Sequence, residues 1–172
     1  MIKILFVCHG NICRSPMAEF IFRDMTEKAH VADQVSVASA ATSREEIWGD
    51  VGNPVYPPAE AELKRHGLTG AGKYAVQLTA SDYDKYDFLI GMDDNNIRNM
   101  ERMTGHARGD KIHKLMSYAG KNSDVSDPWY SRRFDVAYRD IEDGCQAFLE
   151  YLFREGFLEK HSVQSDSDAV VV

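Results

Sequence analysis

The chain has 172 residues, which suits one domain with a hydrophobic core, and its 44% hydrophobic and 27% charged residues are ordinary for a globular protein. The formal net charge of −7 argues against a nucleic-acid-binding protein, and no apolar run reaches the length of a membrane span. Three cysteines, an odd number, fit no disulfide framework. We therefore expect a protein that binds neither nucleic acid nor membrane, with the reducing cytoplasm as its compartment and a monomer as the default state.

Strands and helices are predicted to alternate along the chain. In chain order we predict a strand over residues 2–7, a helix over 16–30, a strand over 35–38, a loop over 43–58, a helix over 59–66, a strand over 87–92, a helix over 93–103, a strand over 111–116, a loop over 118–130 and a helix over 131–155. The last helix has an apolar stripe that steps by three and four residues: Phe134, Tyr138, Ile141, Cys145, Phe148 and Leu152. The alternation predicts an α/β fold with a parallel sheet covered on both faces.

An anion-binding loop is predicted where the first strand ends. Cys8 is followed after five residues by Arg14 and Ser15, with Gly10 inside the loop and Pro16 expected as the first helical residue. Backbone N–H groups of such a loop, together with the positive end of the following helix, converge on a tetrahedral anion. That field is expected to lower the pKa of the Cys8 thiol, and Arg14 offers a planar fork that matches two phosphate oxygens. The pattern predicts a thiol nucleophile at the floor of a phosphate site.

Two motifs resemble those of the low-molecular-weight protein tyrosine phosphatases. The first runs from Cys8 to Glu19, and the second is Asp127-Pro128-Trp129-Tyr130. Shorter similar segments lie between them: Ser39 to Ser43, Trp48, and Met92-Asp93. The resemblance implies a three-layer α/β/α fold with a central four-stranded parallel sheet, in which the first strand is central.

The resemblance covers about residues 1–157, which we predict to form a single phosphatase domain. Residues 158–172 are expected to be a tail, and its last dozen residues, His161 to Val172, are expected to be disordered.

Three residues are predicted to carry the reaction. Cys8 would attack phosphorus and form a cysteinyl-phosphate intermediate, and Arg14 would bind the equatorial oxygens and stabilise their charge. Asp127 would act as general acid toward the leaving phenolate and then activate water. Asp124 is the weaker candidate for this acid because it lacks the proline and aromatic context. The chemistry needs no metal or other cofactor, and the six histidines show no ligand spacing, so we expect none.

Further residues are predicted to bind phosphate and substrate or to support the loop. The loop contributes His9, Gly10, Asn11, Ile12, Cys13 and Ser15, and an aromatic ring would lie between Trp48, Trp129 and Tyr130. The resemblance implies that Ser15 donates a hydrogen bond to the sulfur. It also implies that Asn11, in a left-handed conformation, and Ser39 share one hydrogen-bond network.

The resemblance leaves two features of this site open. A histidine that often joins the Asn11–Ser39 network has no clear match in this chain, where Lys73 falls nearest. The resemblance also implies that Cys13 forms a reversible disulfide with Cys8. We predict that the third cysteine, Cys145, lies in the core.

Three other functions compete with phosphotyrosine hydrolysis. Arsenate reduction on this fold needs extra cysteines, and residues 60–110 contain none. Protein-arginine phosphatases of nearly the same loop have threonine at the position of Ile12, whose apolar side chain instead favours a phenyl ring. A phosphotyrosine-binding module without catalysis is not supported, because all three catalytic side chains are present. We expect a phosphotyrosine-containing protein as the partner, a tyrosine kinase among the candidates.

Overall fold

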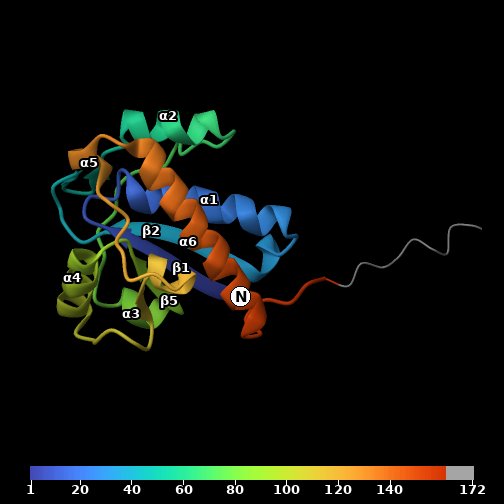
Figure 1. The fold of residues 1–172 in the computed structure, drawn as a ribbon. Helices are drawn as coiled ribbons and strands as arrows, with labels where there is room; N and C mark the ends of the chain where they lie inside the picture. The colour runs from blue at the N-terminus through green and yellow to red at the C-terminus, as the bar shows by residue number, and fades with distance from the viewer. Residues whose placement is uncertain (162–172) are drawn as a thin grey trace, which may run out of the picture.

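The computed structural model describes residues 1–161, and its centre is a four-stranded parallel sheet in the order β2-β1-β5-β6 (Figure 1). The strands are β1 (Ile2–Cys8), β2 (Val35–Ala41), β5 (Phe88–Gly91) and β6 (Ile112–Lys114). β1 lies between β2 and β5, and it pairs with β2 along its whole length, from Ile2 with Val35 to Cys8 with Ala41. The predicted α/β fold, with the first strand inside the sheet, is confirmed.

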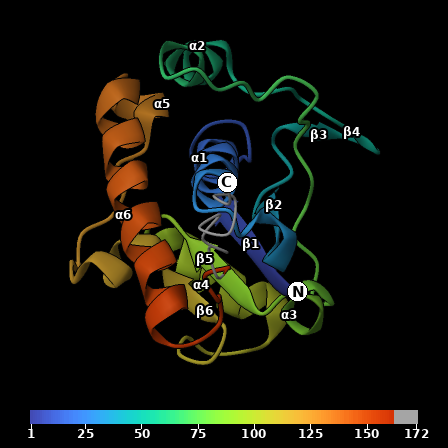
Figure 2. The same ribbon diagram turned by 90° about the vertical axis from the view of Figure 1, so that its right-hand side faces the viewer.

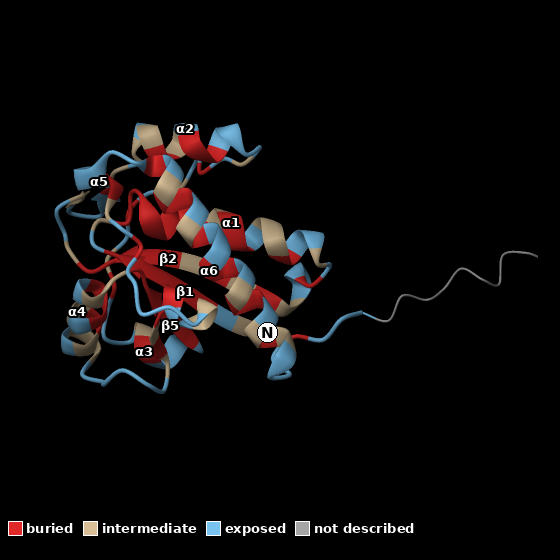
Figure 3. Cartoon of the chain, in the orientation of Figure 1, coloured by how far each residue is buried: buried red, intermediate tan, exposed pale blue. Residues whose placement is uncertain are grey.

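The two faces of the sheet are covered by different helices, which gives three layers (Figure 2). Successive side chains of a strand point to opposite faces, so Ile4 and Phe6 of β1 pack in one core, and Leu5 and Val7 pack in the other. The first core contains residues of α1 (Arg14–Lys28) and α6 (Phe134–Arg154). The second contains residues of α3 (Asp82–Lys85) and α4 (Asp94–Thr104). Figure 3 shows that most residues of β1 and β2 are buried.

The predicted apolar stripe of the last helix faces the first core. All six of its residues are buried in α6. Phe148 of this stripe lies 5.3 Å from Phe22 and 6.5 Å from Phe6, measured between ring centroids, so α6, α1 and β1 share one aromatic cluster. A Cβ on Gly144 would come within 2.7 Å of the Leu115 side chain, so a glycine at this point lets α6 pack closely. These contacts hold α6 against the sheet and against α1, which lies in the same layer.

Three helices begin two or three residues away from their predicted starts. α1 starts at Arg14, so Pro16 is its third residue and not its first; proline is still tolerated there because the first four N–H groups of a helix have no partner within the helix. α2 (Pro57–Arg65) begins with two prolines that its first turn accepts. α6 begins at Phe134, three residues after the predicted start at 131.

Short elements occur inside segments that were predicted as loops or left unassigned. A small hairpin of β3 (Ile47–Trp48) and β4 (Val51–Gly52) lies within 43–58, where Gly49 takes a left-handed conformation in the turn. α5 (Pro128–Ser131) begins after Asp127, whose side chain caps its first turn. α3 was not predicted. The predicted fourth strand is shorter and leads into a 3₁₀ helix, η2 (Leu115–Ala119), and another, η1 (Ala32–Gln34), precedes β2.

The chain continues to pack against the domain after α6. Leu158 is buried in the first core, and Glu159 exchanges two hydrogen bonds with the Gln34 side chain, at 2.7 and 3.0 Å. His161 lies 3.2 Å from the Asp33 carboxylate. The first residues of the predicted tail are therefore attached to η1, and residues 162–172, for which disorder was predicted, lie outside the described residues. No helix within 1–161 is long and apolar enough to cross a membrane.

Candidate active site

The segment between β1 and α1 curls around the Cys8 sulfur. Cys8 is the last residue of β1, and α1 begins at Arg14. Asn11, between them, is buried with a φ of +56°, a left-handed conformation that asparagine tolerates better than most residues. The backbone N–H of Ser15 donates to Cys8 Sγ at 3.4 Å, and Ser15 Oγ lies 3.0 Å from the same sulfur. The positive end of α1 is thus directed at Cys8.

The Ser15 hydroxyl has a defined direction, which Asn11 sets. Val76 N–H donates to Asn11 Oδ1 at 3.1 Å, so the Asn11 amide nitrogen faces the two serines. Asn11 Nδ2 donates to Ser15 Oγ at 2.8 Å and to Ser39 Oγ at 2.9 Å. Because Ser15 Oγ accepts from Asn11, its own hydrogen is left for Cys8 Sγ. Asn11 and Ser39 thus share the network that the resemblance implies.

Glu19 and Lys73 close this network on the side away from Cys8. Ser39 Oγ donates to Glu19 Oε1 at 2.6 Å, and Arg23 lies 2.9 Å from the other oxygen of this buried carboxylate. Lys73 Nζ donates to the Ser39 carbonyl at 2.9 Å and lies 3.8 Å from Glu19. Burial lowers the pKa of Lys73, and the Glu19 carboxylate opposes that shift. Lys73 therefore takes part in the Asn11–Ser39 network, in which the resemblance implied a histidine that this chain does not clearly have.

Arg14 is buried and held by two elements that are distant in the sequence. Its Nη1 donates to Asp93 Oδ2 at 2.7 Å and to the Val125 carbonyl at 2.8 Å, while Nη2 lies 3.6 Å from Asp127 Oδ2. Burial acts to lower the pKa of Arg14, but the charges of Cys8, Asp93 and Asp127 outweigh it and raise this pKa. The guanidinium is a fixed positive charge at the wall of the pocket.

Asp127, and not Asp124, reaches this pocket. Asp127 Oδ1 accepts from the Trp129 N–H at 3.0 Å and caps α5, which leaves Oδ2 on the side of Arg14. Asp124 is instead paired with Lys114 Nζ at 2.9 Å and accepts from the Asp94 N–H at 3.2 Å. The geometry favours Asp127 as the group that can exchange a proton with a bound substrate.

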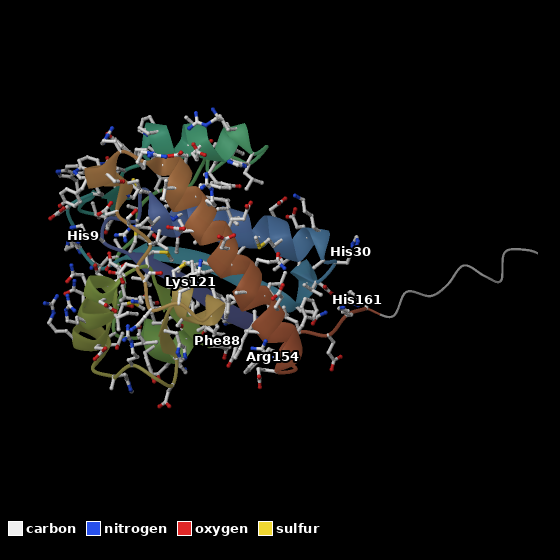
Figure 4. The ribbon with its side chains drawn as sticks, viewed as in Figure 1. His9, His30, Phe88, Lys121, Arg154 and His161 are labelled. Atoms are coloured by element: carbon white, nitrogen blue, oxygen red, sulfur yellow. The ribbon has the colours of Figure 1, made fainter. Side chains whose placement is uncertain are left out.

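The pocket above Cys8 is lined by nine of the thirteen predicted site residues. It is lined by Cys8, His9, Gly10, Ile12, Cys13, Arg14, Glu45, Glu46, Asp127, Trp129 and Tyr130. Figure 4 shows His9 at the end of the molecule where α4 and α5 lie, away from His30 and His161. Asn11, Ser15 and Ser39 are buried behind this lining. A phosphate ester can therefore enter at the carboxyl end of β1, where ligands of open parallel sheets usually bind.

Trp48, which was predicted to line the pocket, does not line it. It belongs to the β3–β4 hairpin, its exposed fraction is 64%, and it is absent from the pocket lining. Gly49 and Asp50 form the turn between Trp48 and Val51, and Glu45 and Glu46, which precede the hairpin, line the pocket instead. The two other predicted aromatic residues, Trp129 and Tyr130, do line the pocket, and Tyr130 is 83% exposed at its mouth.

Sequence reasoning missed the roles of three carboxylates. Glu45 and Glu46 follow an arginine in a charged run, a pattern that normally marks a solvated loop, so the sequence offered no signal for them. Asp93 offered one, because it follows directly after a buried strand that runs parallel to β1. The carboxyl ends of parallel strands lie at the same edge of the sheet, so the sequence could have predicted that Asp93 lies near the Cys8 loop.

Cys13 is a buried free thiol that lines the same pocket as Cys8. Burial is the largest cause that raises its pKa, and the charges of Cys8 and Asp127 add to it. All three cysteines are free, so the Cys8–Cys13 disulfide stays a prediction. Within residues 1–161, no group of three His, Cys, Asp or Glu side chains is placed to hold a metal ion.

Comparison with known proteins gives a consistent result. The family model described as low molecular weight phosphotyrosine protein phosphatase matches residues 3–158. The low molecular weight protein-tyrosine-phosphatase YfkJ of Bacillus subtilis is 36% identical over 157 residues, which cover 90% of this chain and 98% of YfkJ. Its crystal structure matches with a TM-score of 0.82, over 90% of this chain and 96% of that one.

Two further relatives show the range of named activities. The human low molecular weight phosphotyrosine protein phosphatase is 37% identical over 153 residues, which cover 86% of this chain and 94% of the human protein. The crystal structure of a drosophila arginine phosphatase is 31% identical with a TM-score of 0.77, and the match covers 87% of this chain and 97% of that one. The match to the family model spans nearly the whole chain, and the fold and the pocket agree with it. The chain belongs to the low molecular weight phosphotyrosine protein phosphatase family.

Proposed function

We propose that the protein hydrolyses phosphotyrosine in protein substrates through a cysteinyl-phosphate intermediate, with Cys8 as nucleophile, Arg14 as phosphate ligand and Asp127 as general acid. The observation that carries this proposal is the meeting of these three side chains in one pocket, although Asp127 lies far from Cys8 in the sequence. Cys8 Sγ lies at the N-terminus of α1, where loop amides and the helix end favour an anion.

The reaction proceeds in two displacements at phosphorus. The Cys8 thiolate forms the S–P bond as the P–O bond to the tyrosyl oxygen breaks, and Asp127 gives its proton to that oxygen. Arg14 and the loop amides stabilise the charge on the equatorial oxygens. Water then attacks the phosphocysteine and gives a proton to Asp127. Phosphate leaves, and the Ser15 hydroxyl, 3.0 Å from Cys8 Sγ, donates to the departing thiolate.

The pocket walls support a phenyl ring as the group that carries the phosphate. Ile12 offers an apolar side chain next to the loop, and Trp129 and Tyr130 offer flat aromatic surfaces at the mouth. A long guanidine substrate would gain no hydrogen bond from Ile12, which has no polar side-chain atom. We propose phosphotyrosine over phosphoarginine for this reason.

We further propose that the protein acts as a cytoplasmic monomer and that tyrosine kinases are among its substrates. The cytoplasmic site is supported by the reaction itself, because a thiol nucleophile needs a reducing compartment. Cys8, Cys13 and Cys145 are all free, as such a compartment requires.

The test is phosphate release from a phosphotyrosine peptide and a phosphoarginine peptide of matched sequence, assayed side by side without added metal. We expect fast release from phosphotyrosine that the Cys8→Ser variant abolishes. The Ile12→Thr variant should shift the ratio of the two rates toward phosphoarginine. A wild-type preference for phosphoarginine would overturn the choice of substrate, and no release from either peptide would favour a phosphotyrosine-binding module.

A further inference from the structure

A second hollow, which we call the side groove, continues from the pocket on the other side of Ile12. Ile12, Glu46 and Trp129 line both hollows and so form the wall between them. Beyond this wall the side groove is lined by residues that precede or begin α2: Asn53, Pro54, Val55, Tyr56 and Pro57. A peptide whose phosphotyrosine lies in the pocket therefore has a place for a neighbouring side chain.

The walls of the side groove are attached to the Cys8 loop and to α5. Tyr56 N–H donates to the Ile12 carbonyl at 2.8 Å, and the rings of Tyr56 and Trp129 lie 4.9 Å apart. The Asn53 N–H donates to the Glu46 carbonyl at 2.8 Å. These contacts join the groove directly to the segment that would bind phosphate, so the two hollows have a fixed separation.

The side groove is mostly apolar but has one carboxylate on its shared wall. Asn53 Nδ2 donates to Glu46 Oε2 at 2.6 Å and orients this carboxylate. Within residues 1–161, the other oxygen of Glu46, Oε1, has no hydrogen-bond partner.

The charges around Glu46 leave this wall negative. Glu45, the preceding residue, lies at the mouth of the pocket and is paired with His9 at 3.0 Å. Arg132 lies over the Tyr56 ring, 5.5 Å from its centroid, but lines neither hollow. The wall is therefore negative on the side that a substrate would meet.

We propose that the side groove receives a lysine or arginine side chain that neighbours the phosphotyrosine in the substrate, an inference that rests on the proposed function. The aliphatic stem lies along Pro54 and Tyr56, and the cationic head group pairs with Glu46 Oε1. Trp129 adds an aromatic surface that attracts a cation. A purely aliphatic side chain would cover the Glu46 carboxylate without a partner, which costs free energy. An acidic side chain would be repelled by Glu46 and Glu45.

The test compares kcat/KM for phosphotyrosine peptides that differ in the residues on either side of the phosphotyrosine. Each neighbouring position carries lysine, norleucine, alanine or glutamate in turn. We expect lysine to be preferred over norleucine and alanine by about two- to fivefold at one of the positions, the size of a partly exposed ion pair, and glutamate to be the poorest. In Glu46→Gln the lysine preference over norleucine should disappear. The ratio is taken within each enzyme, so a general change in activity cancels.

Glu45→Gln is the matched control, because Glu45 carries the same charge at the mouth but does not line the side groove. It should keep most of the lysine preference. An equal loss in both variants would show a general field and overturn the groove assignment. A preference for norleucine over lysine, or equal rates for all peptides, would also overturn it while leaving the proposed function standing. Absence of turnover with every peptide would overturn both.

Discussion

Arg14 and Asp93 form an ion pair in which the guanidinium is buried and the carboxylate partly buried, with Nη1 2.7 Å from Oδ2. The same Nη1 also donates to the Val125 carbonyl, so one edge of the guanidinium is fully used and the other is directed toward Asp127 and the pocket. Asp93 does a second task with its other oxygen, since Oδ1 accepts from the Asn96 N–H at 2.7 Å and caps α4. The start of α4 therefore positions Arg14, the residue that we propose as the phosphate ligand.

Asp93→Asn should separate these two tasks. Asparagine caps a helix about as well as aspartate, so the free energy of unfolding should change little through α4. The loss of the charge loosens Arg14, and a small displacement of such a group can cost up to about 100-fold in rate. We expect kcat/KM for an aryl phosphate to fall by tenfold or more on this scale. Asp93→Ala should show the same loss of activity with a further loss of about 1 kcal/mol in stability. Wild-type kinetics in Asp93→Asn would show that Arg14 does not depend on this pair.

Asp127→Asn should lower turnover, and the size of the loss should depend on how strongly the leaving group needs a proton. The variant keeps an oxygen that can accept from the Trp129 N–H, so α5 retains its cap. It cannot give a proton to the tyrosyl oxygen, and loss of a general acid costs about 10²- to 10⁴-fold. We expect that loss with phenyl phosphate or a phosphotyrosine peptide, and a smaller one with p-nitrophenyl phosphate, whose leaving group needs no proton. Asp124→Asn is the control and should retain wild-type turnover. A loss of equal size in Asp124→Asn would reverse the assignment of the acid.

Local pattern predicted the part of the site that lies within one continuous segment, and the second motif, supported by the family resemblance, added Asp127, Trp129 and Tyr130. Cys8, Arg14 and the loop between them connect a strand to a helix, and local pattern is enough to identify such a unit. The order of strands and helices likewise predicted the parallel sheet, and the stripe on α6 predicted its buried face.

Contacts between distant segments were harder to predict. The pairing of Arg14 with Asp93 joins residues 79 positions apart, and no local pattern specifies it. Trp48 was misplaced for a related reason: the hairpin of β3 and β4 has strands of two residues each, too short for any periodicity, so its direction could not be predicted. Glu45 and Glu46 directly precede that hairpin, and their place in the pocket lining could not be predicted for the same reason.

Alkylation should distinguish the three cysteines. Burial is the main cause that raises the pKa values of Cys13 and Cys145, so both stay protonated at neutral pH, and the thiolate is the species that reacts. Cys8 lies in the pocket and accepts a hydrogen bond from the Ser15 N–H. We expect iodoacetamide to modify Cys8 alone in the folded protein, as checked by peptide mass spectrometry, and inorganic phosphate to slow that reaction. In Cys8→Ser the folded protein should stay unmodified until denaturant exposes the others. Equal labelling of Cys13 and Cys8 would contradict this selectivity.

Tyr138 should make the fold sensitive to alkaline pH. Its ring stacks on His66 with centroids 3.8 Å apart, and burial first, with the charges of Glu142 and Asp24, raises its pKa from 10.0 to about 12. The folded state therefore holds the phenol proton more tightly than the unfolded state does. This contribution to stability is fully present below pH 10 and is lost as the pH rises from about 10 to about 12.

Tyr138→Phe removes that ionisation and keeps the ring. Between about pH 10 and 12 the free energy of unfolding, measured by urea titration, should fall more steeply for the wild type than for the variant. Burial also raises the pKa of Tyr118, but this group is present in both proteins and so cancels in the comparison. The two curves should run parallel below about pH 9, where the phenol is protonated in both states. Parallel curves over the whole range would mean that the Tyr138 hydroxyl titrates alike in the folded and unfolded chain, and that its position between α6 and His66 does not exclude the phenolate.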